Sequence, residues 1–163
     1  MNSLPNLLKG SQRTRFFRRT PVRTFIISPF IVLAAELLVN PGALSFDPRF
    51  VPLMLWGYLQ YWLCGCYRVK HGGGGPGIET PPDRLVLSGP YAFTRNPMYL
   101  GHIIFLIGLT LALRSWLAAL ITVGSTIWFH LRVLDDEKKL PVCLGPSYVE
   151  YQRRVKRWIP GLF

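Results

Sequence analysis

A stretch at residues 83–102, DRLVLSGPYAFTRNPMYLGH, holds the side chains of this chain that are best suited to bind a charged molecule. Arg84 and Arg95 can donate hydrogen bonds, and Tyr91 and Tyr99 combine hydroxyls with aromatic rings. The glycines and prolines among them interrupt helical backbone. Irregular backbone at the edge of a membrane must line a cavity or lie buried in protein, so the stretch predicts a cofactor-binding loop. A membrane-surface connector is the alternative interpretation.

Two blocks of this sequence resemble one known superfamily. The first block is LVLSGPYAFTRNPMYLG at residues 85–101, and the second is an acidic pair followed by LPVCLG and PSYVEYQRRVKRWIP, ending at residue 160. They are similar to the signature blocks of the isoprenylcysteine carboxyl methyltransferase and phospholipid methyltransferase superfamily, in the same order and spacing. The resemblance covers roughly residues 70–160, whereas the preceding residues match only as generic membrane helices.

The resemblance implies an all-α integral-membrane enzyme that uses S-adenosylmethionine. This cofactor needs donors for its carboxylate, an acid near its ammonium or ribose, and an apolar slot for its purine. The two blocks contain all three kinds of group, and NADPH stays open as an alternative cofactor. The expected cofactor-binding residues are Asp83, Arg84, Leu85, Val86, Tyr91, Arg95, Asn96, Pro97, Met98, Tyr99 and Asp136.

The expected catalytic residues are Arg132, Asp136 and Glu137. The resemblance assigns substrate binding to Arg132 and an acidic role to Asp136, with Glu137 as the alternative acid. Positions i and i+4 share a helix face, so Arg132 and Asp136 can both point into one cavity. An exposed ion pair worth about a few tenths of a kcal/mol is the alternative for these two residues.

The implied reaction is methyl transfer to a lipid-like or amphiphilic acceptor, either an isoprenylcysteine-type carboxylate or a phospholipid-type amine. A carboxylate needs only a cation such as Arg132 to orient it, whereas an amine must first lose a proton, to Asp136, Glu137 or Tyr151. Asn96 stands where the carboxyl methyltransferases often have histidine, and Asp136 stands where they have glutamate. These two departures leave the acceptor open.

Composition supports a membrane protein. Half of the 163 residues are hydrophobic, yet the net charge is +11. A nucleic-acid-binding protein shares such a charge but does not need several long apolar segments, so no nucleic-acid partner is expected. The three cysteines have the spacing of neither a zinc site nor a disulfide framework, and no metal site is predicted.

Two other functions compete with methyl transfer. The first is a membrane reductase of the sterol-reductase type that uses NADPH, although the chain is short and lacks an arginine cluster for a 2′-phosphate. The second is a small non-enzymatic transporter built around Glu36, because a carboxylate at membrane depth is a functional candidate. Glu36 lies one turn before Asn40-Pro41-Gly42, which favours an interfacial position instead.

The chain is expected to fold as a single membrane domain with about four transmembrane helices. We predict a basic tail at 1–24, two spans within 25–67, a cofactor loop at 68–97, a helical hairpin at 98–134 and a C-terminal region at 135–163 that closes the cofactor site. The two spans are expected at about Phe25–Leu44 and Phe50–Tyr67. The hairpin is expected to turn at Arg114–Ser115, and a C-terminal helix, capped by Ser147, to follow a break at Pro141.

The distribution of basic residues predicts the orientation. Seventeen of the nineteen Lys and Arg residues lie in the tail, the 68–97 loop and the region after residue 131. Four spans place these three regions on one side, which the positive-inside rule makes cytoplasmic. Both termini and the active site are therefore expected on the cytoplasmic face of a cell membrane or an endomembrane, with membrane lipids as partners. The sequence leaves the oligomeric state open.

Overall fold

The computed structural model describes residues 19–42, 44–73 and 83–158, and these are helical without any strand. The all-α prediction is thus confirmed for the described part of the chain. The first helical rod joins α2 (Thr20–Val22), the π-helical segment η1 (Arg23–Ile27) and α3 (Ser28–Val39). The later elements are η2 (Pro48–Phe50), α4 (Val51–Gly72), η3 (Gly89–Ala92), α5 (Pro97–Leu113), α6 (Trp116–Leu144) and α7 (Pro146–Arg154).

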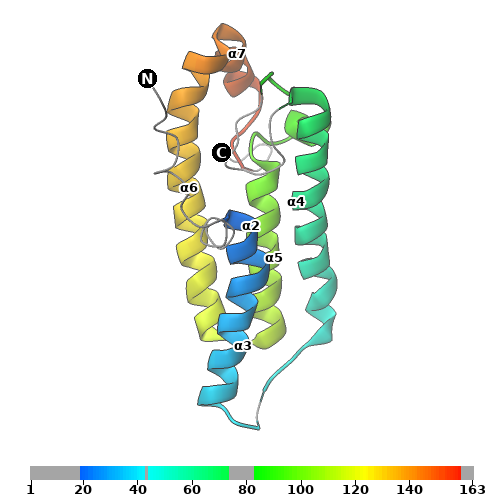
Figure 1. The fold of residues 1–163 in the computed structure, drawn as a ribbon, viewed down its shortest axis with the longest axis vertical. Coiled ribbons are helices and arrows are strands. Elements are labelled where there is room, and N and C mark those ends of the chain that lie inside the picture. Colours follow the sequence, from blue (N-terminus) through cyan, green and yellow to red (C-terminus); the bar gives the residue numbers. More distant parts are fainter. Residues whose placement is uncertain (1–18, 43, 74–82, 159–163) are drawn as a thin grey trace, which may run out of the picture.

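The long helices lie lengthwise beside one another (Figure 1). α4, α5 and α6 run side by side, the first rod lies in front of α5, and α7 caps the end of α6. One buried cluster joins α3, α5 and the start of α6 around Leu106 and Ala118. A second joins α4, the start of α5 and the middle of α6 around Tyr99 and Phe129. α5 contributes to both clusters and is therefore the central helix.

Glycines allow α4 and α5 to pack with their backbones almost in contact. A Cβ atom on Gly57 would lie 2.5 Å from the Phe105 backbone nitrogen, and one on Gly101 would lie 2.7 Å from the Gly57 carbonyl oxygen. A Cβ on Gly108 would meet the Met54 side chain at 2.7 Å. Small residues serve this purpose at helix interfaces in membranes. The α4–α5 contact holds the loop that precedes α5 in place.

The predicted hairpin is confirmed, with its turn at Arg114 and Ser115. Arg114 adopts the left-handed conformation with a φ of 49°, which ends α5. Ser115 caps α6, because its Oγ accepts a hydrogen bond from the Ala118 backbone nitrogen at 3.2 Å. Glu36 accepts a hydrogen bond from the Ser115 hydroxyl at 2.5 Å. The carboxylate thus links α3 to the N-terminus of α6, where the helix dipole favours negative charge.

Helix ends differ from the prediction at several places. The first helical rod begins at Thr20 and ends at Val39, because Pro41 disfavours helical backbone at Asn40. α4 continues to Gly72, beyond the predicted end at residue 67. The predicted break at Pro141 is wrong, since α6 continues to Leu144. The predicted Ser147 cap is also wrong, because Gly145, with a φ of 70°, occupies the N-cap position of α7.

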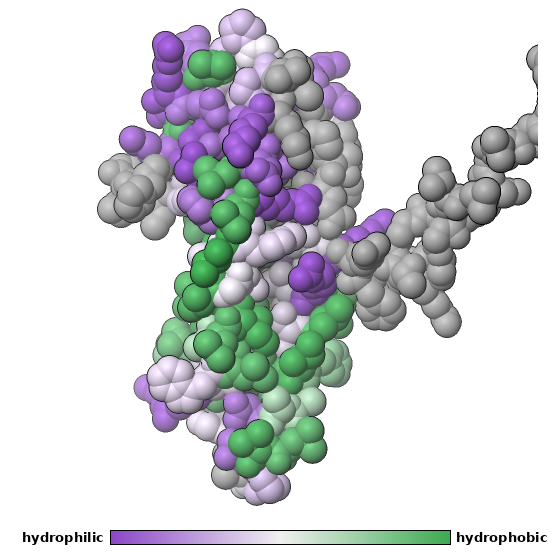
Figure 2. All heavy atoms as spheres, turned by 90° about the vertical axis from the view of Figure 1, so that its left-hand side faces the viewer, coloured by the Kyte–Doolittle hydropathy of each residue, from purple (hydrophilic) through white to green (hydrophobic). Residues whose placement is uncertain are grey.

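Two of the described helical segments are long and apolar enough to cross a membrane, Thr20–Val39 and Trp116–Lys138. α5 is apolar but spans only 17 residues, so the count of four spans stays a prediction. Figure 2 shows hydrophobic residues covering the middle of the α6 face and hydrophilic residues gathered at the end that carries α7. That division is expected for a helical bundle seated in lipid with one polar end in water.

Candidate functional site

The two signature blocks meet through Tyr99 and Asp136. The Tyr99 hydroxyl donates a hydrogen bond to the Asp136 carboxylate at 3.3 Å, and the Tyr99 side chain is 5% exposed. Tyr99 lies in the first turn of α5, and Asp136 lies on α6 well beyond the turn of the hairpin. Because α5 and α6 run antiparallel as a hairpin, the two residues lie beside one another at the same height along the bundle. Of the predicted site residues, these two form one of the contacts that join the blocks, and Arg95 and Glu137 form another.

Arg132 lies one helical turn before Asp136 on α6. Its guanidinium lies over the Trp128 ring, 5.5 Å from the ring centroid, in cation–π geometry. Its Nε atom is buried and has no hydrogen-bond partner among the residues that the structure describes. Leaving a buried charged donor unpaired is unfavourable. Arg132 therefore offers a donor, next to an acidic acceptor, that the protein itself does not use.

Glu137 is committed to two arginines, Arg95 and Arg157. Its carboxylate lies 3.1 Å from Arg95 Nη1 and 2.7 Å from Arg157 Nη2. The side chains of Glu137 and Arg95 are each 10% exposed. The hydrogen bond to Glu137 raises the pKa of Arg157. We call these three residues the clasp, because they tie α6 to the loop before α5 and to the C-terminal segment.

The C-terminal segment runs back along the signature loop. Thr94 Oγ1 and Asn96 Nδ2 donate to the Arg157 carbonyl at 3.1 and 3.2 Å. The Arg95 backbone nitrogen donates to the Lys156 carbonyl at 3.0 Å. The side-chain amide of Asn96 is predicted to bind the cofactor, but its nitrogen donates to the protein's own C-terminal segment. Figure 1 shows this segment descending from α7 toward the start of α5.

α7 is anchored by two buried tyrosines, Tyr148 and Tyr151. Tyr148 and Tyr151 are 4% and 3% exposed. The Tyr151 hydroxyl donates to the Tyr91 carbonyl at 2.6 Å, and the Tyr91 hydroxyl donates to the Cys64 carbonyl at 3.4 Å. Burial raises the pKa of both Tyr151 and Tyr91. Both phenols therefore stay protonated, and each donates its hydrogen bond to a backbone carbonyl. Tyr151 is thus poorly suited to take a proton from a substrate.

The first part of the signature loop is held against α4. The Arg84 backbone nitrogen donates to the Gly72 carbonyl at 2.8 Å, and Val86 is 6% exposed while Leu85 is half-buried. Asp83 and Arg84 are exposed. The role of residues 83–86 in cofactor binding stays a prediction. Pro97 begins α5, and its carbonyl accepts a hydrogen bond from Gln60 at 3.0 Å.

Met98 packs beside Tyr99 in the second buried cluster, where its side chain is 4% exposed. It supplies an apolar neighbour to the Tyr99–Asp136 contact. Trp158 packs against the same cluster, and its indole nitrogen donates to His130 Nδ1 at 3.2 Å. The buried side of the candidate site is therefore apolar, and its polar atoms come from α6 and the signature loop.

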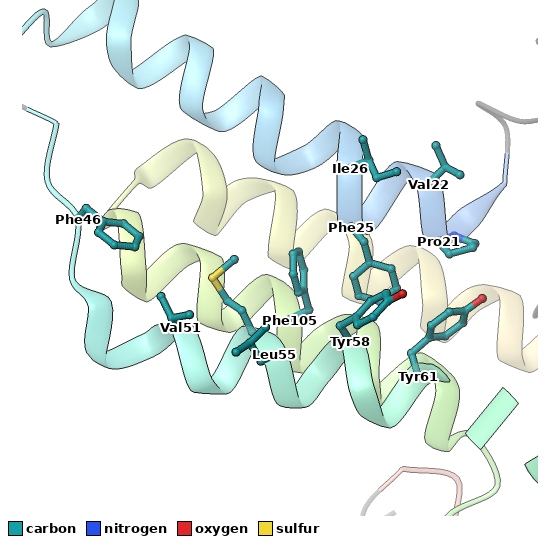
Figure 3. A pocket seen from close by; sticks show the side chains of 11 residues that line it. Pro21, Val22, Phe25, Ile26, Phe46, Val51, Leu55, Tyr58, Tyr61 and Phe105 are labelled. Carbon is teal, nitrogen blue, oxygen red and sulfur yellow. The ribbon is translucent and has the colours of Figure 1, made fainter. Parts of the chain in front are cut away.

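An apolar groove of about 580 Å³ opens between the first helical rod, α4 and α5. Figure 3 shows the Phe25 side chain reaching toward Tyr58, whose ring it meets edge to face at a centroid distance of 5.2 Å, with Tyr61 and Phe105 nearby on α4 and α5. Its lining residues are Pro21, Val22, Phe25, Ile26, Phe46, Val51, Met54, Leu55, Tyr58, Tyr61 and Phe105. Its volume falls within the ~300–1,000 Å³ typical of ligand sites.

Sequence reasoning missed the groove and the role of Arg157. The groove is built by segments that are far apart along the chain, and its apolar residues look like those of any membrane helix. Arg157 belongs to a block that already carried the resemblance, RRVKRW, but it is one of four basic residues there. Nothing in that pattern distinguishes the arginine that turns inward from those that face water.

Known proteins match the part of the chain that contains this site. Residues 75–140 match the family model described as phospholipid methyltransferase. The chain is 32% identical over 78 residues to protein-S-isoprenylcysteine O-methyltransferase of Schizosaccharomyces pombe, which covers 47% of this chain and 33% of that protein. It is 33% identical over 78 residues to the Homo sapiens protein of the same name, with 47% and 27% covered.

The chain therefore spans about a third of the length of the curated relatives it matches. No solved structure matches it significantly. The matched 75–140 region contains Tyr99, Arg132 and Asp136, the residues that the fold brings together. The predicted resemblance is confirmed: the chain is similar to the superfamily of phospholipid methyltransferases and protein-S-isoprenylcysteine O-methyltransferases, and the family model covers the first signature block and the acidic pair that begins the second.

Proposed function

We propose that this protein is an integral-membrane methyltransferase that uses S-adenosylmethionine and acts on a lipid-like or amphiphilic acceptor. The observation that carries the proposal is the hydrogen bond between Tyr99 and Asp136. It joins the two blocks that resemble the superfamily and places them at the polar end of the bundle. Relatives that are named as methyltransferases support the reaction type.

The residues present fit the cofactor. Its carboxylate requires a cation or donor, which Arg84, exposed on the signature loop, can supply. Its ammonium or ribose hydroxyls require an acceptor, which Asp136 on α6 can supply. Met98 supplies apolar surface beside Tyr99. When bound, S-adenosylmethionine supplies an electrophilic methyl group on a sulfonium.

Asp136 rather than Glu137 is the acid that we assign to this site. Glu137 accepts hydrogen bonds from Arg157 at 2.7 and 3.1 Å and pairs with Arg95, so its lone pairs are largely used. Asp136 accepts one hydrogen bond, from Tyr99, in the contacts recorded for the described residues. It thus retains capacity to accept from a cofactor or to take a proton from an amine.

The enzyme's own contribution is mainly positioning, because displacement at a methyl group depends on alignment of the reacting atoms. Arg132 would orient a carboxylate acceptor, and Asp136 would receive the proton of an amine acceptor. The hydrocarbon part of either acceptor suits the apolar groove, which is bounded by α4, α5 and the first helical rod. We place the cofactor side on the cytoplasmic face, where the basic segments are expected.

Calorimetric titration with S-adenosylhomocysteine tests the proposal directly. The wild-type protein in detergent should bind it saturably, and Asp136→Ala should weaken binding about 10- to 150-fold, as expected for ~1.5–3 kcal/mol from a hydrogen bond to a charged group. Asp135→Ala is the matched control, because Asp135 is 65% exposed and pairs only with the exposed Lys138 in the described structure. It should leave the affinity within about twofold.

A methyl-label transfer assay with total membrane lipids then identifies the acceptor. Label is expected in an organic-soluble product that depends on the wild-type protein and is reduced by Asp136→Ala. Mass identification of the product separates a carboxylate from an amine acceptor. Wild-type protein that shows no saturable S-adenosylhomocysteine binding would refute the methyltransferase proposal.

A further inference from the structure

His102 is buried in the centre of the bundle without a hydrogen bond. Its side chain is fully buried, at 0% exposure, and neither ring nitrogen has a hydrogen-bond partner among the described residues. Buried polar groups nearly always have such a partner, and an unsatisfied one costs about 1–3 kcal/mol. An apolar side chain would avoid this penalty, so the histidine calls for a functional explanation.

His102 lies directly behind the wall of the apolar groove. Its ring stacks on Phe25 with a centroid distance of 4.6 Å, and the Tyr61 ring is 4.7 Å away. Both of these aromatic residues line the groove. On its other side the imidazole contacts Phe129 at 5.4 Å, and that ring packs on Tyr99 at 5.3 Å. His102 thus lies between the groove and the Tyr99–Asp136 contact.

The spacing of residues on α5 also places His102 between a residue of the groove and Tyr99 along the helix axis. Tyr99, His102 and Phe105 are three residues apart and so lie on neighbouring positions of one helix face. With a rise of 1.5 Å per residue, each step is about 4.5 Å along the axis. Phe105 lines the groove and Tyr99 bonds Asp136. His102 therefore lies between the groove residue Phe105 and Tyr99 along this face of α5.

Phe25, one of the two rings between His102 and the groove, belongs to the π-helical segment Arg23–Ile27. Single π-helical turns inside α-helices often mark functional sites. Figure 3 shows the Phe25 side chain reaching from that segment toward Tyr58 and Tyr61 on α4. Phe25 and Tyr61 together cover the imidazole on the side of the groove.

We propose that His102 is an acceptor-binding residue, which hydrogen-bonds the polar end of an amphiphile whose hydrocarbon chain occupies the groove. The occupant is an unbranched hydrocarbon chain that ends in a hydrogen-bonding group. A neutral imidazole can serve it, because one ring nitrogen donates and the other accepts. The inference rests on the proposed function, since the occupant's polar end then lies one turn of α5 from Tyr99, which bonds Asp136.

Photocrosslinking in lipid nanodiscs tests the proposal with a defined probe, hexadecanol that carries a diazirine near the middle of its chain. Mass spectrometry should locate the label on groove residues such as Tyr58 or Leu55. Unlabelled hexadecanol should compete at least about tenfold better than hexadecane, the equivalent of ~1.4 kcal/mol. His102→Phe should reduce that preference to less than about twofold while labelling persists. His102→Gln, which keeps donor and acceptor, should retain most of it.

Thermal unfolding separates this role from a packing role. Replacing an unsatisfied polar group by an apolar ring is neutral or stabilising, so His102→Phe should unfold at the same midpoint as the wild type or higher. Phe25→Ala, which removes one of the two covering rings, should raise the labelling rate. An unchanged preference for hexadecanol in His102→Phe, or label that falls outside the groove, would overturn the proposal. S-adenosylhomocysteine binding, measured separately, reports on the methyltransferase assignment alone.

Discussion

The clasp formed by Glu137, Arg95 and Arg157 gives the sharpest test of how the site is held together. Glu137→Ala removes the carboxylate that both guanidiniums share. Arg95 is then left as a charge with a side chain only 10% exposed. The C-terminal segment keeps its backbone contacts with Thr94 and Asn96 but loses its ionic connection to α6.

The expected loss of stability follows from burial. Removing one partner of a buried ion pair typically costs about 3–5 kcal/mol. Arg157 is 27% exposed, so water can partly solvate it once Glu137 is gone, and we expect the lower end, about 3 kcal/mol. For a chain of this size about 2–4 °C corresponds to 1 kcal/mol. The unfolding midpoint should therefore fall by roughly 6–12 °C.

Tryptophan fluorescence during heating in detergent measures the midpoint. Asp135→Ala is the control, because it removes a carboxylate two residues away on the same helix, from an ion pair whose side chains are 77% and 65% exposed. An exposed pair is worth about 0–1 kcal/mol, so this midpoint should move by less than about 4 °C. Equal shifts for the two variants would refute the inference that burial makes the clasp strong.

Three further predictions concern packing, pH and Glu36. Gly101→Ala should destabilise the protein by about 1–3 kcal/mol, by forcing α4 from α5, whereas Gly124→Ala, which meets open space on α6, should not lower the unfolding midpoint; equal midpoints would contradict the close packing. Hydrogen bonds from Arg49 lower the pKa of Asp47 to about 2. The ionised Asp47 carboxylate therefore stabilises the folded protein fully above about pH 4, and this contribution is lost as the pH falls through 2. The difference in unfolding midpoint between wild type and Asp47→Asn should therefore shrink over that window, and a constant difference would argue against it. Glu36→Gln should leave S-adenosylhomocysteine affinity within about twofold, because Glu36 bonds Ser115 at the opposite end of the bundle from Asp136; a larger loss would contradict a purely structural role.

Much of the candidate site was predictable because its parts are local. Arg132 and Asp136 are one helical turn apart wherever that helix lies. Arg114 and Ser115 interrupt a long apolar stretch with a charged residue and a capping residue, so the hairpin and its turn could be read from the chain. Once the hairpin is known, its two arms must be antiparallel, which brings Tyr99 near Asp136.

The division of labour between Asp136 and Glu137 could not be predicted in the same way. The two acids are adjacent and chemically similar, and helical geometry only says that they point in different directions. Glu137 is committed because Arg157, twenty residues later, returns along the signature loop to meet it. That return depends on the Gly145 turn and on the burial of Tyr151 beneath Tyr91, which are tertiary contacts.

The sequence by itself determined the helical class, the basic distribution and the identity of the blocks that carry the resemblance. These are properties of composition and short-range spacing, to which apolar runs and Gly-Pro loops respond locally. Only the tertiary structure decided that His102 is enclosed behind Phe25 and that a groove adjoins it. The physical reason is that burial is a property of contacts between distant segments. An apolar helix face looks the same in sequence whether it meets lipid, a neighbouring helix or a ligand.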